Sequence, residues 1–355
     1  MIEPFTLHVP RADLDDLRDR PARTRRPEEE PGEGHGLPLA RARELVERWQ
    51  AFDWRAQEAA LNAWPQHTTT IDGQRVHFLH VRSPRADALP LVPTHGWPSS
   101  VLDSLDVLEP LSRDFHLVVP SIPGFGPSGP THDAGWGVER VARAWAELMD
   151  RLGYRRYGAQ GGDRGSGISL ALGAVAPGAV VGVHVNYLPT PPPHSTEGLS
   201  ARDVERVRAV ERFLAQGPAY QLLHATRPQT VAYGLTDSPV GLLGWVADRV
   251  DEWLDPASGV HDDRLIASVA LYWLTGTAGS ALRIARETPP GPVRCPVPLG
   301  VAVFPHDIVL AVRGVAERVF DVRRWTEFDR GGHFPALEVP DLLVADVRAF
   351  FAGLR

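Results

Sequence analysis

Cysteine is almost absent from this chain of 355 residues, since Cys295 is the only one. A single cysteine excludes an internal disulfide framework and a cysteine-rich metal site. Long apolar runs are also missing, so we expect no membrane anchor, and the N-terminus lacks the charged-then-apolar pattern of a signal segment. Positive charge is not in excess, because 37 Arg residues, with no Lys, stand against 44 Asp and Glu residues. These absences argue against a nucleic-acid partner and favour a cytoplasmic protein.

Hydrophobic residues make up 43% of the chain, which is enough for one large core with insertions or for two small domains. Residues 1–66 are predicted to be a helical meander of three segments, DLDDLRDRPART, LARARELVERWQAF and WRAQEAALNAW, because apolar residues recur at helical spacing in the first two. The polar loop PEEEPGEGHG lies between these first two segments. The next segment, HTTTIDGQRVHFLHVRS, alternates on both sides of Asp72-Gly73, which is typical of a β-hairpin.

From about residue 89, predicted strands and helices alternate, which indicates a mostly parallel, doubly wound α/β sheet. The strands are expected over residues 89–94, 116–121, 157–160, 180–187, 298–304 and 325–329. Residues 188–296 interrupt this order with a Pro-rich and then helical insertion, in which DRLIASVALYWLTGTAGSALRIARE is predicted to be one helix. We therefore expect a core in two parts, residues 67–187 and 297–355. The insertion should form a lid over the carboxyl ends of the strands, where such sheets bind ligands.

The segment GGDRG lies between a predicted strand and a predicted helix, with Asp163 at its centre. Glycine-flanked turns of this kind are typical of a nucleophile elbow. A simpler interpretation is that Asp163 only caps the helix, a common role for aspartate. As a nucleophile, a carboxylate suits saturated electrophilic carbon, with which it forms an alkyl ester that water can hydrolyse. Epoxides and alkyl halides are substrates of this type.

The other catalytic groups are expected after the lid, because sites of this kind run nucleophile, acid, histidine along the chain. His333, in DRGGHFPALEV, follows the last predicted strand and is the candidate base. Asp307 follows the strand VPLGVAVF and is the candidate acid that orients it, whereas we interpret the adjacent His306 as structural. The turn THGWPSS would aim the N–H of Trp97, together with that of Arg164, at a developing oxyanion.

The lid should distinguish the two substrate types. An opening epoxide leaves an alkoxide that needs a proton, and tyrosine hydroxyls can supply one at neutral pH. A departing halide needs only N–H donors. The lid contains Tyr220, Tyr233 and Tyr272, and each could instead be a core aromatic residue.

With these residues in place, the chain resembles the microsomal-type epoxide hydrolases, which have an N-terminal helical meander before an α/β-hydrolase domain. The resemblance covers nearly the whole chain and rests on segments in the same order, among them RPARTRRP, THGWPSS, SIPGFGPSG, GAQGGDRGSGIS, LTDSPVGLLGW, LYWLTGT and DRGGHFPALEVPDLL. It implies Asp163 as nucleophile, His333 as base, Asp307 as the acid (glutamate in many relatives) and Tyr220 as the first lid tyrosine.

Two positions depart from that family's pattern. Ala285 stands where such enzymes usually have a second tyrosine, and Arg164 stands where many have tryptophan or an apolar residue. Tyr272 is a candidate for the missing proton donor. Arg164 either keeps Asp163 ionised and contacts a polar substrate, or forms a salt bridge with the lid.

The sequence thus predicts an epoxide hydrolase that forms vicinal diols through an ester on Asp163, with no metal or organic cofactor. Two alternatives share the elbow: a hydrolytic dehalogenase, and a non-hydrolytic protein that guides epoxide opening or only binds a ligand. The expected partner is a small-molecule epoxide, from detoxification or secondary metabolism, and a homodimer is compatible with this fold.

Overall fold

The computed structural model describes residues 1–29, 32, 34–216, 218–289, 291 and 294–354. Within these residues, nine strands form one sheet in the order β1-β2-β3-β5-β4-β6-β7-β8-β9. The pairs from β1 to β5 are antiparallel and the others are parallel. The predicted α/β sheet is therefore confirmed. Its strands are β1 (Ile2–Phe5), β2 (Gln66–Ile71), β3 (Gln74–Val81), β4 (Leu89–Thr94), β5 (Phe115–Pro120), β6 (Tyr157–Gly161), β7 (Val180–Val185), β8 (Leu299–Val303) and β9 (Val322–Glu327).

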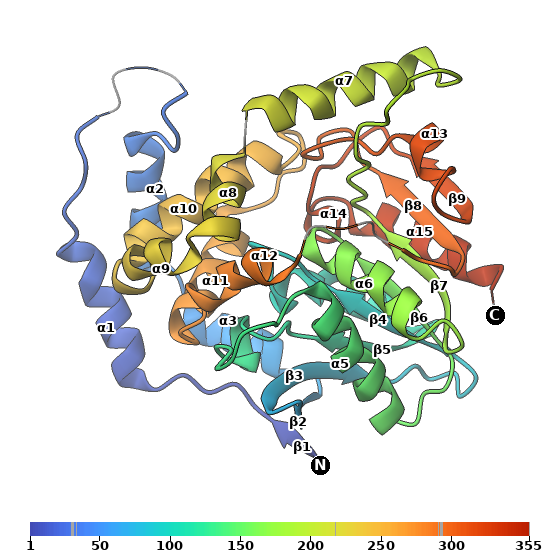
Figure 1. Cartoon of the computed structure of the whole chain (residues 1–355). Coiled ribbons are helices and arrows are strands. Elements are labelled where there is room, and N and C mark those ends of the chain that lie inside the picture. Colours follow the sequence, from blue (N-terminus) through green and yellow to red (C-terminus); the bar gives the residue numbers. More distant parts are fainter. Residues whose placement is uncertain (30–31, 33, 217, 290, 292–293, 355) are drawn as a thin grey trace.

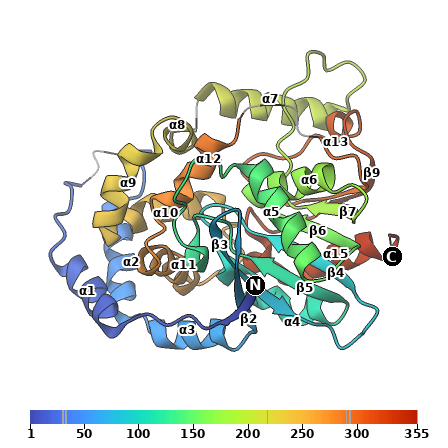
Figure 2. The same cartoon turned by 60° about the horizontal axis from the view of Figure 1, so that its bottom comes forward.

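Helices cover both faces of the sheet, as Figures 1 and 2 show. α5 and α6 pack together on one face, and α6 also contacts β4, β6 and β7. α4 packs against β5 and against α15, which also contacts β7, β8 and β9. These core helices are α4 (Leu105–Ser112), α5 (Val138–Arg151), α6 (Arg164–Val175), α13 (Arg313–Ala316), α14 (Pro335–Glu338) and α15 (Pro340–Ala352).

A helical insertion separates β7 from β8, and we call residues 188–296 the lid. Its helices are α7 (Ala201–Gln216), α8 (Ala219–Thr226), α9 (Pro228–Asp237), α10 (Pro239–Trp253), α11 (Asp262–Leu274) and α12 (Arg283–Glu287). The N-terminal helices α1 (Arg11–Ala22), α2 (Leu39–Ala51) and α3 (Trp54–Asn62) pack against α10 and α11, and Figure 1 shows α1 and α2 beside the lid. From α2, Arg41 donates to Asp251 at 3.0 Å and to Asp262 at 2.6 Å. We propose that residues 1–66 stabilise the position of the lid on the core.

The hairpin between β2 and β3 is confirmed. Asp72 and Gly73 both have positive φ, 50° and 77°, as the tight turn of a two-residue hairpin requires. Of the loop PEEEPGEGHG, residues 30, 31 and 33 lie outside the described residues.

Two local predictions need correction. Residues 1–66 are not wholly helical, because Ile2–Phe5 forms the edge strand β1, antiparallel to β2. The lid segment from residue 262 to 287 is not one helix, because Gly276 has φ 66° and the Thr277 N–H donates to the Tyr272 carbonyl at 2.9 Å. A glycine in this conformation just after the last turn ends a helix. Tyr272 and Ala285 therefore lie on different helices, α11 and α12.

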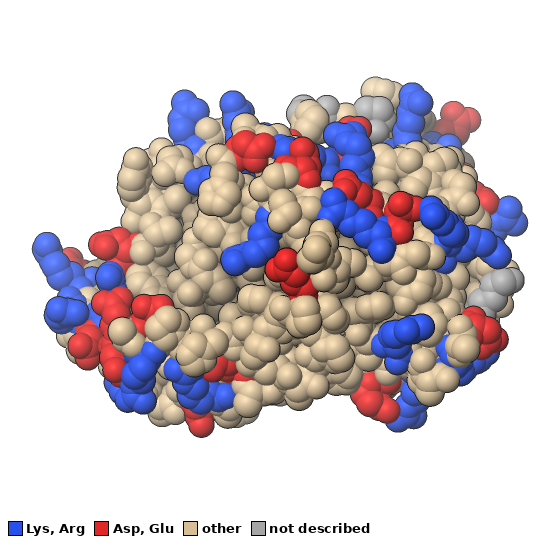
Figure 3. All heavy atoms as spheres, turned by 90° about the horizontal axis from the view of Figure 1, so that it is seen from below, with Lys and Arg blue, Asp and Glu red and all other residues tan. Residues whose placement is uncertain are grey.

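The surface carries both signs of charge. Figure 3 shows Arg interspersed with Asp and Glu on the face seen from below. Among the residues that the structure describes, no helix is both long enough and apolar enough to cross a membrane.

Candidate active site

Asp163 occupies the turn between β6 and α6, with backbone angles φ 48° and ψ −126°. Such a positive φ is strained for a residue with a side chain, so the surrounding structure must hold it. Neighbouring glycines permit the close packing: a Cβ on Gly165 would overlap the carbonyl oxygen of Thr94, and a Cβ on Gly96 would overlap the Asp163 side chain. The strand, the turn and the helix approach as a nucleophile elbow requires.

The Asp163 carboxylate does not cap α6, so the simpler interpretation of this residue is wrong. Its Oδ1 instead accepts a hydrogen bond from the backbone N–H of Trp97 at 2.8 Å, and the side chain is 17% exposed. Burial raises the pKa of Asp163, but His333, the Arg164 charge and the Trp97 N–H together outweigh it and hold that pKa below its ordinary value. The carboxylate is therefore ionised, with one oxygen held and the other, Oδ2, available.

His333 lies beside this second oxygen, with its Nε2 3.5 Å from Oδ2 of Asp163. On the other side of the imidazole, Nδ1 donates to Oδ1 of Asp307 at 2.6 Å. Burial lowers the pKa of His333, but the two carboxylates raise it to about 10 overall. Burial also raises the pKa of Asp307, against the effect of His333. The structure thus brings together the three residues that the sequence predicts as nucleophile, base and acid. His306 packs alongside: its ring lies 3.6 Å from Asp255, outside this group.

Aromatic lid residues face the elbow. Tyr220, in α8, stacks on Trp97 with ring centroids 5.6 Å apart and contacts Trp253 at 5.2 Å. Burial, followed by the charge of Asp163, raises the pKa of Tyr220 well above its ordinary value, so the phenol keeps its proton. His224 lies edge-on to Trp97 at 4.6 Å, and burial lowers its pKa to about 4.

The remaining predicted residues are placed differently. The Tyr272 hydroxyl donates to the Ser99 carbonyl at 2.6 Å and its ring is buried, so its proton is already engaged. Ala285 is half-buried in α12, which packs against α8. Tyr233 is 72% exposed. Arg164 is half-buried, and within the described residues its guanidinium forms neither a salt bridge nor a hydrogen bond, so the predicted salt bridge with the lid is not seen.

Comparison with known proteins places this geometry in a family. Residues 2–104 match the family model described as Epoxide hydrolase N terminus, and residues 90–218 match that of the alpha/beta hydrolase fold. The solved structure of Aspergillus niger epoxide hydrolase superposes with a TM-score of 0.93 at 34% identity, over 100% of this chain and 97% of that one. The chain belongs to the epoxide hydrolase family.

Other relatives agree with this assignment. A protein of Stigmatella aurantiaca, provisionally named as an epoxide hydrolase, is 41% identical over 100% of this chain and 86% of its own length. Epoxide hydrolase 1 of Sus scrofa is 29% identical over 100% of this chain and 89% of its own length. The juvenile hormone epoxide hydrolase of Bombyx mori superposes with a TM-score of 0.91 at 26% identity, covering 100% of this chain and 95% of that one. The predicted family and enzyme class are confirmed.

The loop that carries His333 is held by two buried carboxylates that sequence reasoning missed. Asp255, just after α10, accepts the N–H of Gly331 at 2.8 Å. Glu338, in α14, accepts the N–H groups of Asp255 and Phe334, each at 2.7 Å. In the same region, the His333 N–H donates to the Trp253 carbonyl at 3.0 Å. The end of α10 in the lid thereby fixes the backbone around His333, and we call Asp255 and Glu338 the loop clamp.

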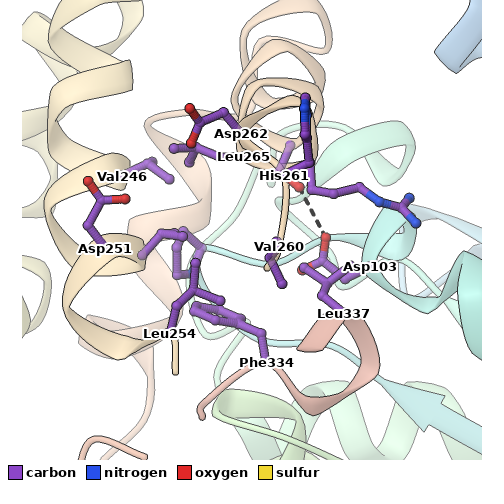
Figure 4. A pocket seen from close by; sticks show the side chains of 14 residues that line it. Asp103, Val246, Asp251, Leu254, Val260, His261, Asp262, Leu265, Phe334 and Leu337 are labelled. Atoms are coloured by element: carbon purple, nitrogen blue, oxygen red, sulfur yellow. Dashed lines mark hydrogen bonds between the residues drawn. The ribbon is translucent and has the colours of Figure 1, made fainter. Parts of the chain in front are cut away.

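Two cavities adjoin the site and share Asp103, Phe334 and Leu337 in their linings. One, of about 80 Å³, is lined by Asp163 and His333 and can hold more than one water molecule. The other, of about 30 Å³, lies between the lid and α14, and Figure 4 shows Phe334 and Leu337 facing Leu254 across it. At their junction, burial raises the pKa of Asp103 to about 6, and Ser268 donates to its carboxyl group at 3.1 Å. Water can therefore lie close to the base.

In the part of the chain that the structure describes, no cluster of three or more His, Cys, Asp or Glu side chains could hold an ion.

Tyr187, two residues after β7, also lies near His333, with ring centroids 5.2 Å apart, and the sequence analysis did not single it out. Its position could have been noticed, because residues that follow parallel strands collect at the ligand-binding edge of the sheet.

Proposed function

We propose that this enzyme opens an epoxide to a vicinal diol through an alkyl ester on Asp163. One observation carries the proposal: the Asp163 carboxylate has Oδ1 bound to the Trp97 N–H and Oδ2 3.5 Å from Nε2 of a buried histidine. A carboxylate placed in this way is ready to attack saturated carbon, and the ester it forms lies next to a base that can activate water.

In the first step, Oδ2 of Asp163 attacks an epoxide carbon and the C–O bond of the ring breaks. The developing alkoxide takes a proton from the Tyr220 phenol, which is held near the elbow by its stack on Trp97. The resting His333 is protonated, because the two carboxylates raise its pKa to about 10. Esterification removes the charge of Asp163, which lowers the pKa of His333. The proton that His333 then releases restores the Tyr220 phenol, and the imidazole becomes a neutral base.

In the second step, His333 removes a proton from water, and the hydroxide attacks Cγ of the ester. Negative charge develops on Oδ1, which already accepts the Trp97 N–H, and we propose the backbone N–H of Arg164 as the second donor. The intermediate then collapses, the diol oxygen leaves with the proton of the new carboxyl group, and Asp163 is again a carboxylate beside protonated His333. Asp307 holds the imidazole in orientation throughout.

The direct test is product analysis with styrene oxide and cyclohexene oxide. We expect the vicinal diol from at least one of them. We expect no halide from 1-chlorohexane, because the Tyr220 phenol suits an epoxide, whose alkoxide needs a proton, whereas a departing halide needs only N–H donors. Halide release at a rate comparable with diol formation would support the dehalogenase alternative. The absence of diol, with no ester on Asp163, would support the non-hydrolytic one.

Arg164 is expected to set the acid limb of the pH profile. Its charge helps to hold the pKa of Asp163 below its ordinary value. In Arg164→Met that pKa rises, so the nucleophile is lost to protonation at a higher pH than in the parent enzyme. The rate of epoxide consumption, measured from pH 4 to 8, should show an acid limb displaced upward, with little change near pH 8. Arg155→Met, at a 79% exposed side chain, is the matched control; an unmoved acid limb in Arg164→Met would contradict this role.

The loop clamp is expected to affect the second step more than the first. In Glu338→Gln, one of the two N–H groups loses its acceptor, because the amide nitrogen is a donor. Small displacements of a catalytic base cost up to about 100-fold. With enzyme in excess, we expect ester hydrolysis to slow roughly 10- to 100-fold while epoxide consumption stays within a few-fold. Glu317→Gln, at a half-exposed side chain in an exposed helical ion pair, is the control. Equal slowing of both steps would mean that the clamp does not act through His333.

A further inference from the structure

The proposed reaction lacks one of the two tyrosine hydroxyls that would donate hydrogen bonds to the epoxide oxygen. Tyr220 is one phenol near the nucleophile, and Ala285 stands where the resemblance to the microsomal-type epoxide hydrolases implies a second. The Tyr272 hydroxyl does not fill this gap, because it donates to the Ser99 carbonyl at 2.6 Å. The oxygen of a bound epoxide would therefore receive a hydrogen bond from only one lid phenol. Two hydrogen bonds would stabilise the negative charge that develops on this oxygen better than one.

Tyr187 lies beside the nucleophile by strand register. β6 and β7 run parallel with Gly161 opposite Val185, and the Asn186 N–H continues the pairing by donating to the Gly161 carbonyl at 3.1 Å. Two residues beyond this register pair, the two strands lead to Asp163 and Tyr187. Both residues thus leave the same edge of the sheet at the same level, next to one another.

The Tyr187 ring packs against His333. It meets the His333 imidazole edge to face, with centroids 5.2 Å apart and an interplanar angle of 83°. The side chain is mostly buried, yet within the described residues its hydroxyl has no hydrogen-bond partner. Buried tyrosine hydroxyls usually have one. A substrate oxygen in the space above Asp163 would be such a partner.

Electrostatics keep this phenol a donor. Burial, and after it the charges of Asp307 and Asp163, raise the pKa of Tyr187 well above its ordinary value. The hydroxyl therefore keeps its proton at any pH at which the enzyme works. Tyr220 is also among the groups that raise this pKa, which is consistent with two phenols that share one space.

We propose that Tyr187 is a catalytic residue that donates the second hydrogen bond to the epoxide oxygen, in place of the tyrosine missing at position 285. This rests on the proposed function. As Oδ2 of Asp163 bonds to carbon and the ring C–O bond breaks, Tyr220 transfers its proton to the alkoxide. Tyr187 stabilises the same oxygen by its hydrogen bond and keeps its own proton.

The test uses the full-length enzyme in excess over styrene oxide, cyclohexene oxide or cis-9,10-epoxystearic acid, with rapid quenching and mass spectrometry. Loss of epoxide reports the first step, and decay of the ester on Asp163 reports the second. Tyr187→Phe should slow epoxide loss roughly 100- to 1,000-fold, the usual cost of removing one donor to a developing oxyanion, as Tyr220→Phe should, and leave ester decay within a few-fold. Tyr233→Phe, at a 72% exposed side chain, is the matched control and should change neither rate.

Rescue separates catalysis from a structural role. α12 packs against α8, which carries Tyr220, so a tyrosine at position 285 enters the site from the lid rather than from the sheet. Ala285→Tyr should change epoxide loss little when Tyr187 is present, because the oxygen already has two donors. In Tyr187→Phe it should restore most of the lost rate.

Two results would overturn the proposal: epoxide loss at the parent rate in a folded Tyr187→Phe, or slowing confined to ester decay, which would place Tyr187 on the water. Failure of the proposed function is seen separately, in the unmodified enzyme. If that enzyme consumes none of the three epoxides, or consumes them without an ester on Asp163, the role of Tyr187 fails with it.

Discussion

Asp163→Asn should abolish diol formation while leaving the protein folded. A neutral amide does not displace an epoxide C–O bond, and loss of a covalent nucleophile typically costs four to six orders of magnitude or so in turnover. The fold should persist, because asparagine tolerates the positive φ at this turn better than most residues. The Asn carbonyl oxygen can also still accept the Trp97 N–H. Diol formation by mass spectrometry and thermal unfolding by circular dichroism measure the two halves of this expectation.

A control is needed because asparagine beside a basic histidine can hydrolyse back to aspartate. Intact mass resolves the change of about one dalton and reports any recovered Asp163. Asp150→Asn, at an exposed side chain of α5, is the matched substitution and should retain full activity. Substantial turnover by Asp163→Asn with no mass change would show that Asp163 is not the nucleophile.

His333→Gln should convert the enzyme into one that forms the ester but does not clear it. The first step needs the carboxylate and the phenols, whereas the second needs a base to deprotonate water. Glutamine is not such a base, yet its amide can still donate to Asp307, so the buried carboxylate keeps a partner. After exposure to styrene oxide, we expect a mass increase equal to the whole epoxide, mapped to the peptide that contains Asp163.

The double variant Asp163→Asn/His333→Gln is the control for adventitious alkylation. It should gain no mass under the same conditions, because the attacking oxygen is absent. A folded His333→Gln that gains no mass from any epoxide that the parent hydrates would contradict the order of the two steps.

Much of the site could be predicted because its residues are fixed by local pattern. The glycines around Asp163 mark the elbow, and strand ends bring Trp97, Asp307 and His333 to one edge of the sheet whatever the details of packing. The family assignment and the sheet are confirmed, while the roles of the individual residues stay predictions.

The parts that sequence reasoning missed depend on long-range contacts. The helix break between Tyr272 and Ala285 depends on the positive φ of Gly276. The apolar spacing of the segment does not reveal this conformation. Edge strand β1 is four residues long, too short to show a period, and is defined only by its pairing with β2. Asp255 bonds to Gly331 and to Glu338, which lie 76 and 83 residues away along the chain. A local sequence pattern does not predict contacts over such a distance.

The most direct test of the covalent route is a single turnover of the unmodified enzyme in ¹⁸O-labelled water, with enzyme in excess over epoxide. In the proposed route, the oxygen added to the substrate comes from Asp163, and water replaces it in the carboxylate. We predict ¹⁸O in the peptide that contains Asp163 and none in the diol of this first turnover. Label in the diol, with an unlabelled Asp163 peptide, would mean that water attacks the epoxide directly, and would contradict the account.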